Sequence, residues 1–377
     1  MIFHPTLRFQ LSAFVGRRFL RGLFIPCLYI PCLYVLLISV LPVSVSNAQE
    51  DEAPEATGES VTGSVNMVAD DSGINVMMDG QLFTRFHING YDKPILYPVY
   101  GPGQVPMTRN YPMIETEGEE PDHPHHKSVW VGHEINHVDF WTERTGLVVV
   151  DEVSVASNGN EFSVNSNWIR RDDDAVILTD TTVYRFGFDE QVRWMDVAIT
   201  FKASHGEVVF QDTKEGLFAI RVHPKLRARE APRHGVTDVT GRISNAEGIT
   251  GPECWGKPAA WVDYSGEVNR QTVGIAIFDH PENLRHPTTW HARDYGLFAA
   301  NPFGLHHFTG AEAGTGEYKL EEGEELTLRY RAVFHAGDCA QADVPGRYER
   351  WAGRSADEDD SGEASGAYSE ADSGDGG

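Results

Sequence analysis

The sequence predicts an all-β protein, a large antiparallel two-sheet sandwich with long decorated loops. Apolar and polar residues alternate with a period of two in many stretches, and Gly, Asp, Asn and Pro separate these stretches. Helical periodicity is nearly absent from the body of the chain, and no fixed-period repeat of the propeller kind occurs. Strands that follow one another without interleaved helices are typical of a sandwich or a barrel.

The expected strands share this alternation or a short β-prone composition, and they are residues 74–78, 82–88, 95–100, 127–131, 147–156, 161–170, 176–186, 193–202, 217–222, 272–278 and 326–335. Residues 193–202 show the pattern most clearly. Met195, Val197 and Ile199 point to one side, whereas Asp196 and Thr200 point to the other. No shift of composition marks a linker, so we expect one domain over residues 61–354.

Three connections between these strands are long and rich in polar side chains, residues 101–126, 224–260 and 280–307. Each contains histidine. Because long ordered loops in compact domains are usually functional, we expect a binding or catalytic site among them.

Both ends of the chain differ from the body. Residues 1–48 carry arginines, a long apolar run and small residues at Ser46 and Ala48, which predicts a secretory signal peptide and a secreted or periplasmic protein. The alternative is an uncleaved N-terminal membrane anchor. Residues 49–60 and 355–377 are acidic and polar, and we expect both segments to be disordered.

The charge balance restricts the partners. With 31 basic and 56 acidic residues the net charge is −25, which argues against nucleic acid and anionic membranes. No second apolar run approaches the length of the first, so we expect no stable membrane insertion of the mature chain. Beyond the signal peptide only Cys254 and Cys339 remain, and a disulfide or two free thiols are both compatible with their spacing.

One stretch concentrates the chemistry, residues 122–141, which read DHPHHKSVWVGHEINHVDFW. Core packing alone does not select this mixture, because a buried imidazole or carboxylate needs a polar partner. We expect a loop, a short strand and a second loop, so that the imidazoles and acids lie at the two ends of one strand.

Two further segments carry candidate groups. Glu215 stands beside a glycine at the start of an expected strand, where it either faces a cleft or pairs with Lys214 or Arg221 as an ordinary turn acid. The third long loop contributes His291, Arg293, Asn301 and His306. One imidazole from each loop, together with Glu134 or Glu215, would suit a transition metal. The spacing carries no metal signature, so we predict no metal ligand and favour acid/base use of a histidine with a carboxylate. The cofactor stays unknown: none is predicted, and a bound metal ion is the alternative.

Tryptophans accompany these segments, at positions 130, 141, 255 and 290. Aromatic faces beside Asp, Asn, Arg and His are typical of a carbohydrate site, in which C–H faces stack and hydroxyls form hydrogen bonds. The alternative is that these rings plug the ends of the sandwich.

The elements DHPHHKSVWVGHEINHVDFW, KEGLFAIRV and HARDYGLFAANPFGLHHFTG resemble the PmoA-like family of secreted bacterial proteins, labelled "methane oxygenase PmoA". The resemblance covers roughly residues 74–337. Lys127 stands where the family has Arg, and His307 stands where an acid is common. The label implies a copper oxygenase subunit with many membrane spans, which the mature chain lacks. The pattern also resembles, in architecture, the galactose-mutarotase type of supersandwich.

That likeness implies a sugar cleft with a histidine as general acid and a carboxylate as general base. It points to His126 or His133 as the acid and to Glu215 as the base, with Arg221 and Asp139 orienting them. From the long loops and the tryptophans we expect the ligand-binding residues to be His125, Trp130, Trp141, Arg109, His291, Arg293, Asn301 and His306. We therefore expect a carbohydrate-active protein, of epimerase, lyase or hydrolase type. The alternatives are a non-catalytic carbohydrate-binding protein and a metal-dependent oxygenase.

Overall fold

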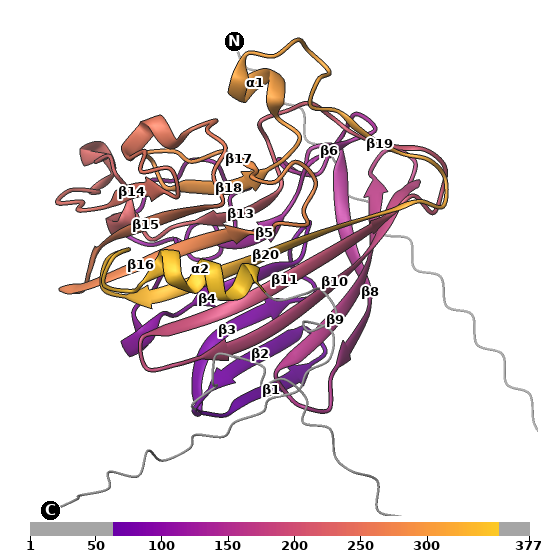
Figure 1. Ribbon diagram of the computed structural model, residues 1–377. Helices are drawn as coiled ribbons and strands as arrows, with labels where there is room; N and C mark the ends of the chain where they lie inside the picture. The colour runs from indigo at the N-terminus through magenta and orange to yellow at the C-terminus, as the bar shows by residue number, and fades with distance from the viewer. Residues whose placement is uncertain (1–62, 354–377) are drawn as a thin grey trace, which may run out of the picture. The chain divides into compact units, whose positions relative to one another are not determined.

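Two eight-stranded antiparallel sheets dominate the computed structural model, which describes residues 63–353 (Figure 1). The predicted signal peptide, the acidic segment 49–60 and the acidic tail 355–377 lie outside the described residues. The first sheet contains, in spatial order, β1 (Val65–Asp70), β2 (Gly73–Met78), β3 (Gln81–His87), β4 (Ile95–Val99), β5 (Val129–Val131), β13 (Phe218–Arg221), β18 (Leu297–Asn301) and β17 (Thr289–Trp290).

The second sheet contains, in spatial order, β14 (Arg242–Asn245), β15 (Trp261–Val268), β16 (Gln271–Asp279), β20 (Glu325–Ala336), β11 (Val192–Lys202), β10 (Val176–Phe188), β9 (Glu161–Arg170) and β8 (Gly146–Val155). A small third sheet contains β19 (Tyr318–Leu320), β12 (Val208–Phe210), β6 (Glu134–Ile135) and β7 (Val138–Asp139). The α-helices are α1 (Leu305–Thr309) and α2 (Val344–Ala352), and single 3-10 turns are Pro102–Gln104, Pro224–Leu226, Pro232–His234 and Gly251–Cys254.

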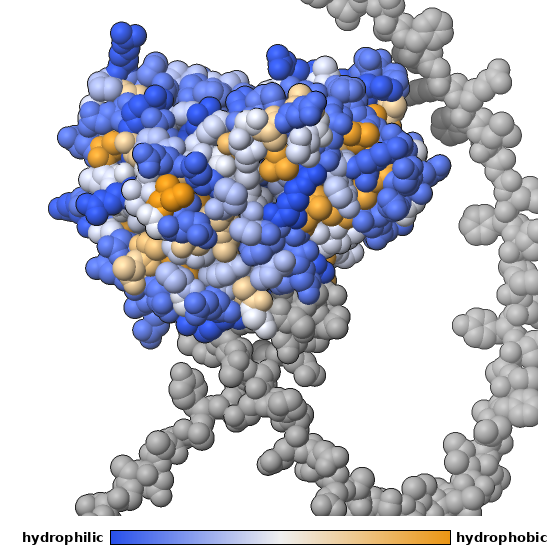
Figure 2. Space-filling view, turned by 45° about the horizontal axis from the view of Figure 1, so that its top comes forward, coloured by the Kyte–Doolittle hydropathy of each residue, from blue (hydrophilic) through white to orange (hydrophobic). Residues whose placement is uncertain are grey.

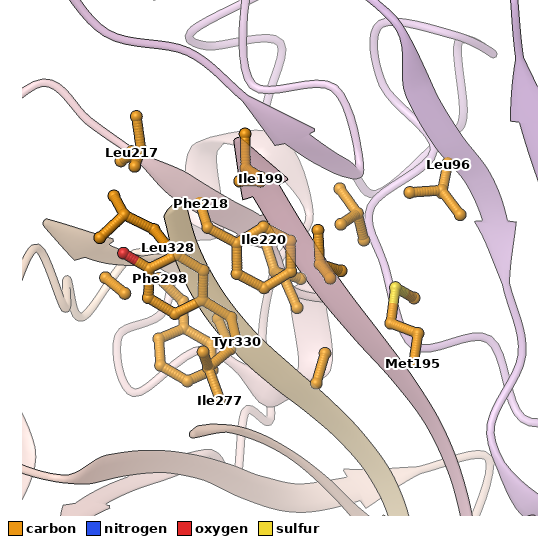
Figure 3. Packing of buried hydrophobic residues seen from close by; sticks show 14 of the residues in the cluster. Leu96, Met195, Ile199, Leu217, Phe218, Ile220, Ile277, Phe298, Leu328 and Tyr330 are labelled. Carbon is orange, nitrogen blue, oxygen red and sulfur yellow. The ribbon is translucent and has the colours of Figure 1, made fainter. Parts of the chain in front are cut away.

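The main hydrophobic core lies between the two large sheets. Phe218 on β13 stacks on Tyr330 of β20 with ring centroids 5.4 Å apart. Phe83 on β3 meets Phe334 of β20 edge to face at 5.5 Å. Figure 3 shows Phe218 and Ile220 of β13 beside Tyr330, and all three side chains are buried. These contacts join the sheets face to face, as the sandwich prediction requires.

Alternation along the strands also builds layers on the outer face of each sheet. On β13, Ala219 and Arg221 point away from the core, and Ala219 packs with Trp130 of β5 in a second apolar cluster. On the second sheet the outer face is covered by α2, whose Trp351 packs near Phe278 of β16 (Figure 1). Both faces of the central strands are therefore buried.

The fold-class prediction is confirmed, and each expected strand occurs with small shifts of its ends. The first long loop contains no strand, as expected, but the other two contain β14, β17 and β18. The loop prediction failed at β18 because Leu297, Phe298 and Ala299 are buried on both faces, so no polar residue alternates with them. β15 was not among the expected strands, although Asp263, Ser265 and Glu267 alternate in it with Val262, Tyr264 and Gly266.

Within the described residues, both cysteines are free, and Cys254 donates to the carbonyl of Ile249. No helix in residues 63–353 is long and apolar enough to cross a membrane. On the face shown in Figure 2, hydrophilic side chains predominate and apolar ones gather only in small patches.

Candidate functional site

A cavity of about 530 Å³ lies on the outer side of the first sheet, next to His126, which stacks on Trp130 of β5. Its walls come from three segments far apart in the sequence. They are the stretch from 123 to 144, the residues just before β13, and the connection between β17 and β18. The lining side chains are His123, His125, His126, Glu134, Asp139, Thr142, Arg144, Lys214, Glu215, His291, Arg293 and Tyr295.

Four aromatic rings stack in a column along one wall. Tyr295 lies parallel to His123 with centroids 5.3 Å apart, and His123 lies parallel to His126 at 4.7 Å. His126 in turn stacks on Trp130 at 5.3 Å. Arg221 lies over the face of Tyr295, 4.8 Å from its centroid. The column fixes the planes of both imidazoles, so their ring nitrogens have fixed directions.

Asp122 fixes the tautomer of His123. One carboxylate oxygen lies 2.6 Å from Nδ1 of His123, and the other accepts from Arg221 at 2.8 Å and from Arg109. Partial burial opposes ionisation, but the bond to His123 and the two arginine charges hold the pKa of Asp122 well below its usual range. A carboxylate must accept, so Nδ1 of His123 carries a proton, and in the neutral form of the ring Nε2 carries the lone pair.

Arg221 sets the opposite tautomer in His126. Its Nη1 lies 3.2 Å from Nδ1 of His126, and because a guanidinium only donates, Nδ1 must accept. The proton of His126 is therefore on Nε2, which forms no hydrogen bond with any residue from 63 to 353. Burial, reinforced by the Arg221 charge, lowers the pKa of His126 well below its ordinary value, so the ring is neutral at pH 7.

Two buried cations hold the backbone of this loop. Arg109 donates to the carbonyls of Glu120 at 3.2 Å, His123 at 3.1 Å and His126 at 3.4 Å. Lys93 donates to the carbonyl of His125 at 3.1 Å. Arg109 was predicted to bind ligand, but its donors are directed into the fold, so the structure places it as a positioning residue.

The second wall combines two ion-pairing groups with a buried imidazole. Lys214 donates to Glu215 at 2.6 Å, and both side chains are about one-third exposed. Nδ1 of His291 lies 4.0 Å from the other oxygen of Glu215, and Nε2 of His291 accepts from Nε of Arg293 at 3.1 Å. Burial, with the charges of Arg293 and Lys214, lowers the pKa of His291 to about 3.

The third wall is made by the turn after β7. Asp139 accepts from the backbone N–H of Thr142 at 2.8 Å, from the Thr142 hydroxyl and from Arg144 at 3.4 Å. Burial would raise the pKa of Asp139, but these hydrogen bonds and the Arg144 charge hold it below its ordinary value. His125 faces the same cavity, and burial together with the Lys93 charge lowers its pKa to about 3.

Several predicted site residues thus meet at the cavity, namely His125, His126, Asp139, Glu215, His291 and Arg293. Others lie behind it. Arg221, Trp130 and Trp141 are buried at or below 2 % exposure and support His126 from beneath.

Three predicted residues lie away from the cavity, and the structure uses each of them internally. The ring nitrogens of His133 lie 3.0 Å from the Glu215 carbonyl and 2.8 Å from the Gln211 carbonyl, so both are engaged within the fold. Asn301 donates to the Thr213 carbonyl and accepts from the N–H of Phe303. His306 is on α1, and its ring contacts the Ala311 carbonyl.

The sequence reasoning omitted His123, Lys214, Arg144, Thr142 and Tyr295 from the site. His123 had a usable signal, because it follows Asp122 directly in the most polar stretch of the chain. Tyr295 had none, since its role depends on how β17 and β18 turn over the sheet.

The described residues do not form a metal centre. Among residues 63–353, no three His, Cys, Asp or Glu side chains gather as metal ligands would. Two ring nitrogens at the cavity, in His126 and His291, already accept from arginine. A guanidinium donor at that position competes directly with a metal ion for the lone pair.

Comparison with protein families matches residues 73–349 to a family of unknown function, DUF6807. The PmoA-like resemblance therefore stays a prediction. Comparison with curated proteins finds no match.

Solved structures with some similarity include a glycoside hydrolase family 97 enzyme from Pseudoalteromonas sp. strain K8, at 12% identity and a TM-score of 0.32, covering 72% of this chain and 33% of that one. An α-galactosidase from Lactobacillus brevis has 9% identity and a TM-score of 0.33, over 75% of this chain and 41% of that one. A galactose mutarotase-like protein from Lactobacillus casei has 9% identity and a TM-score of 0.32, and the match covers 72% of this chain and 100% of that one.

The chain thus spans about a third of the length of the glycoside hydrolase. These TM-scores are too low to carry an argument, so the supersandwich likeness also stays a prediction.

Proposed function

The chain belongs to a family of unknown function, DUF6807, and we propose that it binds a carbohydrate in this cavity and transforms it by acid/base chemistry. One observation carries the proposal. Two stacked imidazoles, 4.7 Å apart, are held in opposite tautomers by different partners, so one offers a lone pair and its neighbour offers a proton.

The roles follow from these tautomers. His123 is the general base through Nε2, because Asp122 holds its Nδ1 proton and stabilises the imidazolium that forms. His126 is neutral, so it acts as a hydrogen-bond donor from Nε2 to an oxygen on which negative charge develops, rather than as a full proton donor. Glu215 was expected to be the base. Its contact with Lys214 and its place on the opposite wall suit it better to holding a sugar hydroxyl.

The ligand class follows from the size and lining of the cavity. A volume of about 530 Å³ accommodates a small molecule of one or two sugar rings. Donors and acceptors both line the walls, among them Thr142, Glu134 and Asp139. Hydroxyl-rich molecules match this combination.

The experiment is turnover on a panel of aldoses, keto-sugars and glycosides by the wild-type chain and its variants. We expect His126→Ala and His123→Gln to abolish turnover while the circular dichroism spectrum stays unchanged. His306→Ala is the matched control, because this imidazole is exposed on α1 outside the cavity. Undiminished rates in both cavity variants would rule out these roles.

A non-catalytic carbohydrate-binding protein is the second candidate, because the same walls would hold a sugar without turnover. Calorimetric binding of a sugar with no chemical change in it would favour this candidate. The copper oxygenase that the PmoA-like resemblance implies is not supported by the donor set described above. Tight stoichiometric binding of copper by the purified chain would support the oxygenase hypothesis.

A further inference from the structure

One cation in the cavity wall has no anionic partner among residues 63–353. Lys214 pairs with Glu215, and Arg144 pairs with Asp139. Arg293 forms no ion pair with any residue that the structure describes. Its only hydrogen bond runs from Nε to His291, which leaves both terminal nitrogens of the guanidinium without a hydrogen-bond acceptor in residues 63–353.

Arg293 is held in a fixed orientation. Its guanidinium lies over the ring of Trp255, 5.2 Å from the centroid, and Nε is anchored on His291 at 3.1 Å. A guanidinium fixed through Nε and by stacking keeps its terminal N–H groups directed outward as a rigid fork. This geometry matches the two oxygens of a carboxylate.

A second buried donor lies beside it. His291 is 1 % exposed, and because its Nε2 accepts from Arg293, its proton is on Nδ1. Its Nδ1 is buried and forms no well-aligned hydrogen bond with residues 63–353, although the Lys214 carbonyl interacts with it and an oxygen of Glu215 lies 4.0 Å away. A buried N–H with a poorly aligned acceptor is costly, and a ligand oxygen would satisfy it.

The acids of the cavity do not exclude an anion. Asp139 and Glu215 are each neutralised by their paired cations. Glu134 has only the exposed His137 as an ion-pair partner, at 3.8 Å, but its own side chain is 38 % exposed and therefore screened by water.

We propose that the carbohydrate is an acidic sugar, a uronate, whose carboxylate binds to the terminal nitrogens of Arg293 and to Nδ1–H of His291. This inference rests on the proposed function, since it assigns the substrate class of the same cavity. A carboxylate fits better than a sulfate ester, because the donors form a planar guanidinium fork with a single N–H beside it.

Calorimetric titration of the full chain tests this proposal by comparing dissociation constants of matched sugars. D-galacturonate is compared with the uncharged D-galactose and D-galacturonamide, and D-glucuronate is compared with D-glucose. We expect each uronate to bind at least about tenfold more tightly than its uncharged counterparts. In Arg293→Met, which removes the charge and keeps an apolar side chain, the preference for the uronate over its uncharged counterpart should fall to within about twofold.

Arg233→Gln is the control, because this arginine is exposed on the 3-10 turn Pro232–His234, outside the cavity. An unchanged melting temperature and circular dichroism spectrum show that Arg293→Met is folded.

Equal affinity for charged and uncharged sugars would overturn this inference and leave the proposed function standing. Tighter binding of galactose 6-sulfate than of galacturonate would overturn the carboxylate assignment. Absence of binding by every sugar would overturn the proposed function itself.

Discussion

At the scale of single residues, the site depends on Asp122. Its carboxylate contacts Arg109, Arg221 and His123, so it joins the buried support to the imidazole at the cavity. Arg221 extends this chain to His126. The two ring tautomers thus share one origin, an ionised carboxylate between two arginines.

Asp122→Asn should therefore reduce kcat far more than its small change in volume suggests. The amide no longer enforces the Nδ1–H tautomer of His123, and it leaves two buried arginines without their counter-charge. We expect a loss in kcat of about 10²- to 10⁴-fold, by analogy with hydrolase triads, with a smaller change in KM. Steady-state kinetics measure both.

Asp173→Asn, in an exposed turn where the carboxylate pairs with Arg170, is the matched control and should keep wild-type rates. A fully active Asp122→Asn variant would show that the His123 tautomer is irrelevant to turnover.

At the scale of elements, the four residues of β13 contribute alternately to the hydrophobic core and to the support of the site. Phe218 and Ile220 face the second sheet, whereas Ala219 and Arg221 face the cavity side. The strand is central, between β5 and β18, so both of its faces are buried. A rigid central strand therefore fixes the position of the guanidinium that sets the His126 tautomer.

Neighbouring substitutions on β13 should have separable effects. Ile220→Ala removes core packing and should lower the free energy of unfolding by about 2–5 kcal/mol, with kcat of the folded fraction retained. Arg221→Lys should instead lower kcat, because an ammonium cannot bridge Asp122 and His126 as the planar fork does. Denaturant unfolding and kinetics on the same preparations distinguish the two. Equal loss of kcat in both variants would contradict the separation.

At the scale of the whole molecule, buried histidines make stability depend on pH. Burial lowers the pKa of His133 and of His223 to about 4 and that of His291 to about 3. In the unfolded chain these groups titrate near about 6.5, so below that pH the unfolded state binds more protons than the folded state. Their contribution to stability is fully present above about pH 6.5 and is lost as the pH falls toward 4.

One carboxylic acid opposes this trend. Burial raises the pKa of Asp180 to about 6, against hydrogen bonds from Thr182 and Trp168, so the folded state takes up this proton first. Between about pH 6 and 4 Asp180 therefore favours the folded state as the pH falls. Because the buried histidines outnumber it, we expect net destabilisation by acid.

His223→Asn isolates one of these contributions. Nδ1 of His223 accepts from the N–H of Lys225, and an asparagine oxygen can replace that acceptor without titrating. Between pH 7 and 4 this variant should lose less unfolding free energy than the wild type, by up to roughly 3 kcal/mol. Thermal or denaturant unfolding across this range measures it. His205→Asn, at an exposed histidine, should follow the wild-type curve, and an identical slope in both variants would contradict the assignment.

Much of the fold could be predicted because half-buried strands leave a period-two pattern. Met195, Val197 and Ile199 face the core as their alternation indicates. β18 is buried on both faces and leaves no such pattern, which is why it was not predicted. Within the site, residue type pointed to His126, Asp139 and Glu215 but could not separate them from His133, whose ring nitrogens contact backbone carbonyls.

The sequence by itself determined the all-β class, the strands that alternate, and the stretch 122–141 as the richest source of chemical groups. Only the tertiary structure decided which imidazoles face the cavity, which tautomers they hold, and that Arg293 lacks an anionic partner in the part of the chain that the structure describes. The physical reason is that alternation is a local property of the chain. Tautomer, charge pairing and access to a cavity depend instead on contacts between residues about a hundred or more positions apart. Examples are the ion pair of Asp122 with Arg221 and the stacking of His123 between His126 and Tyr295.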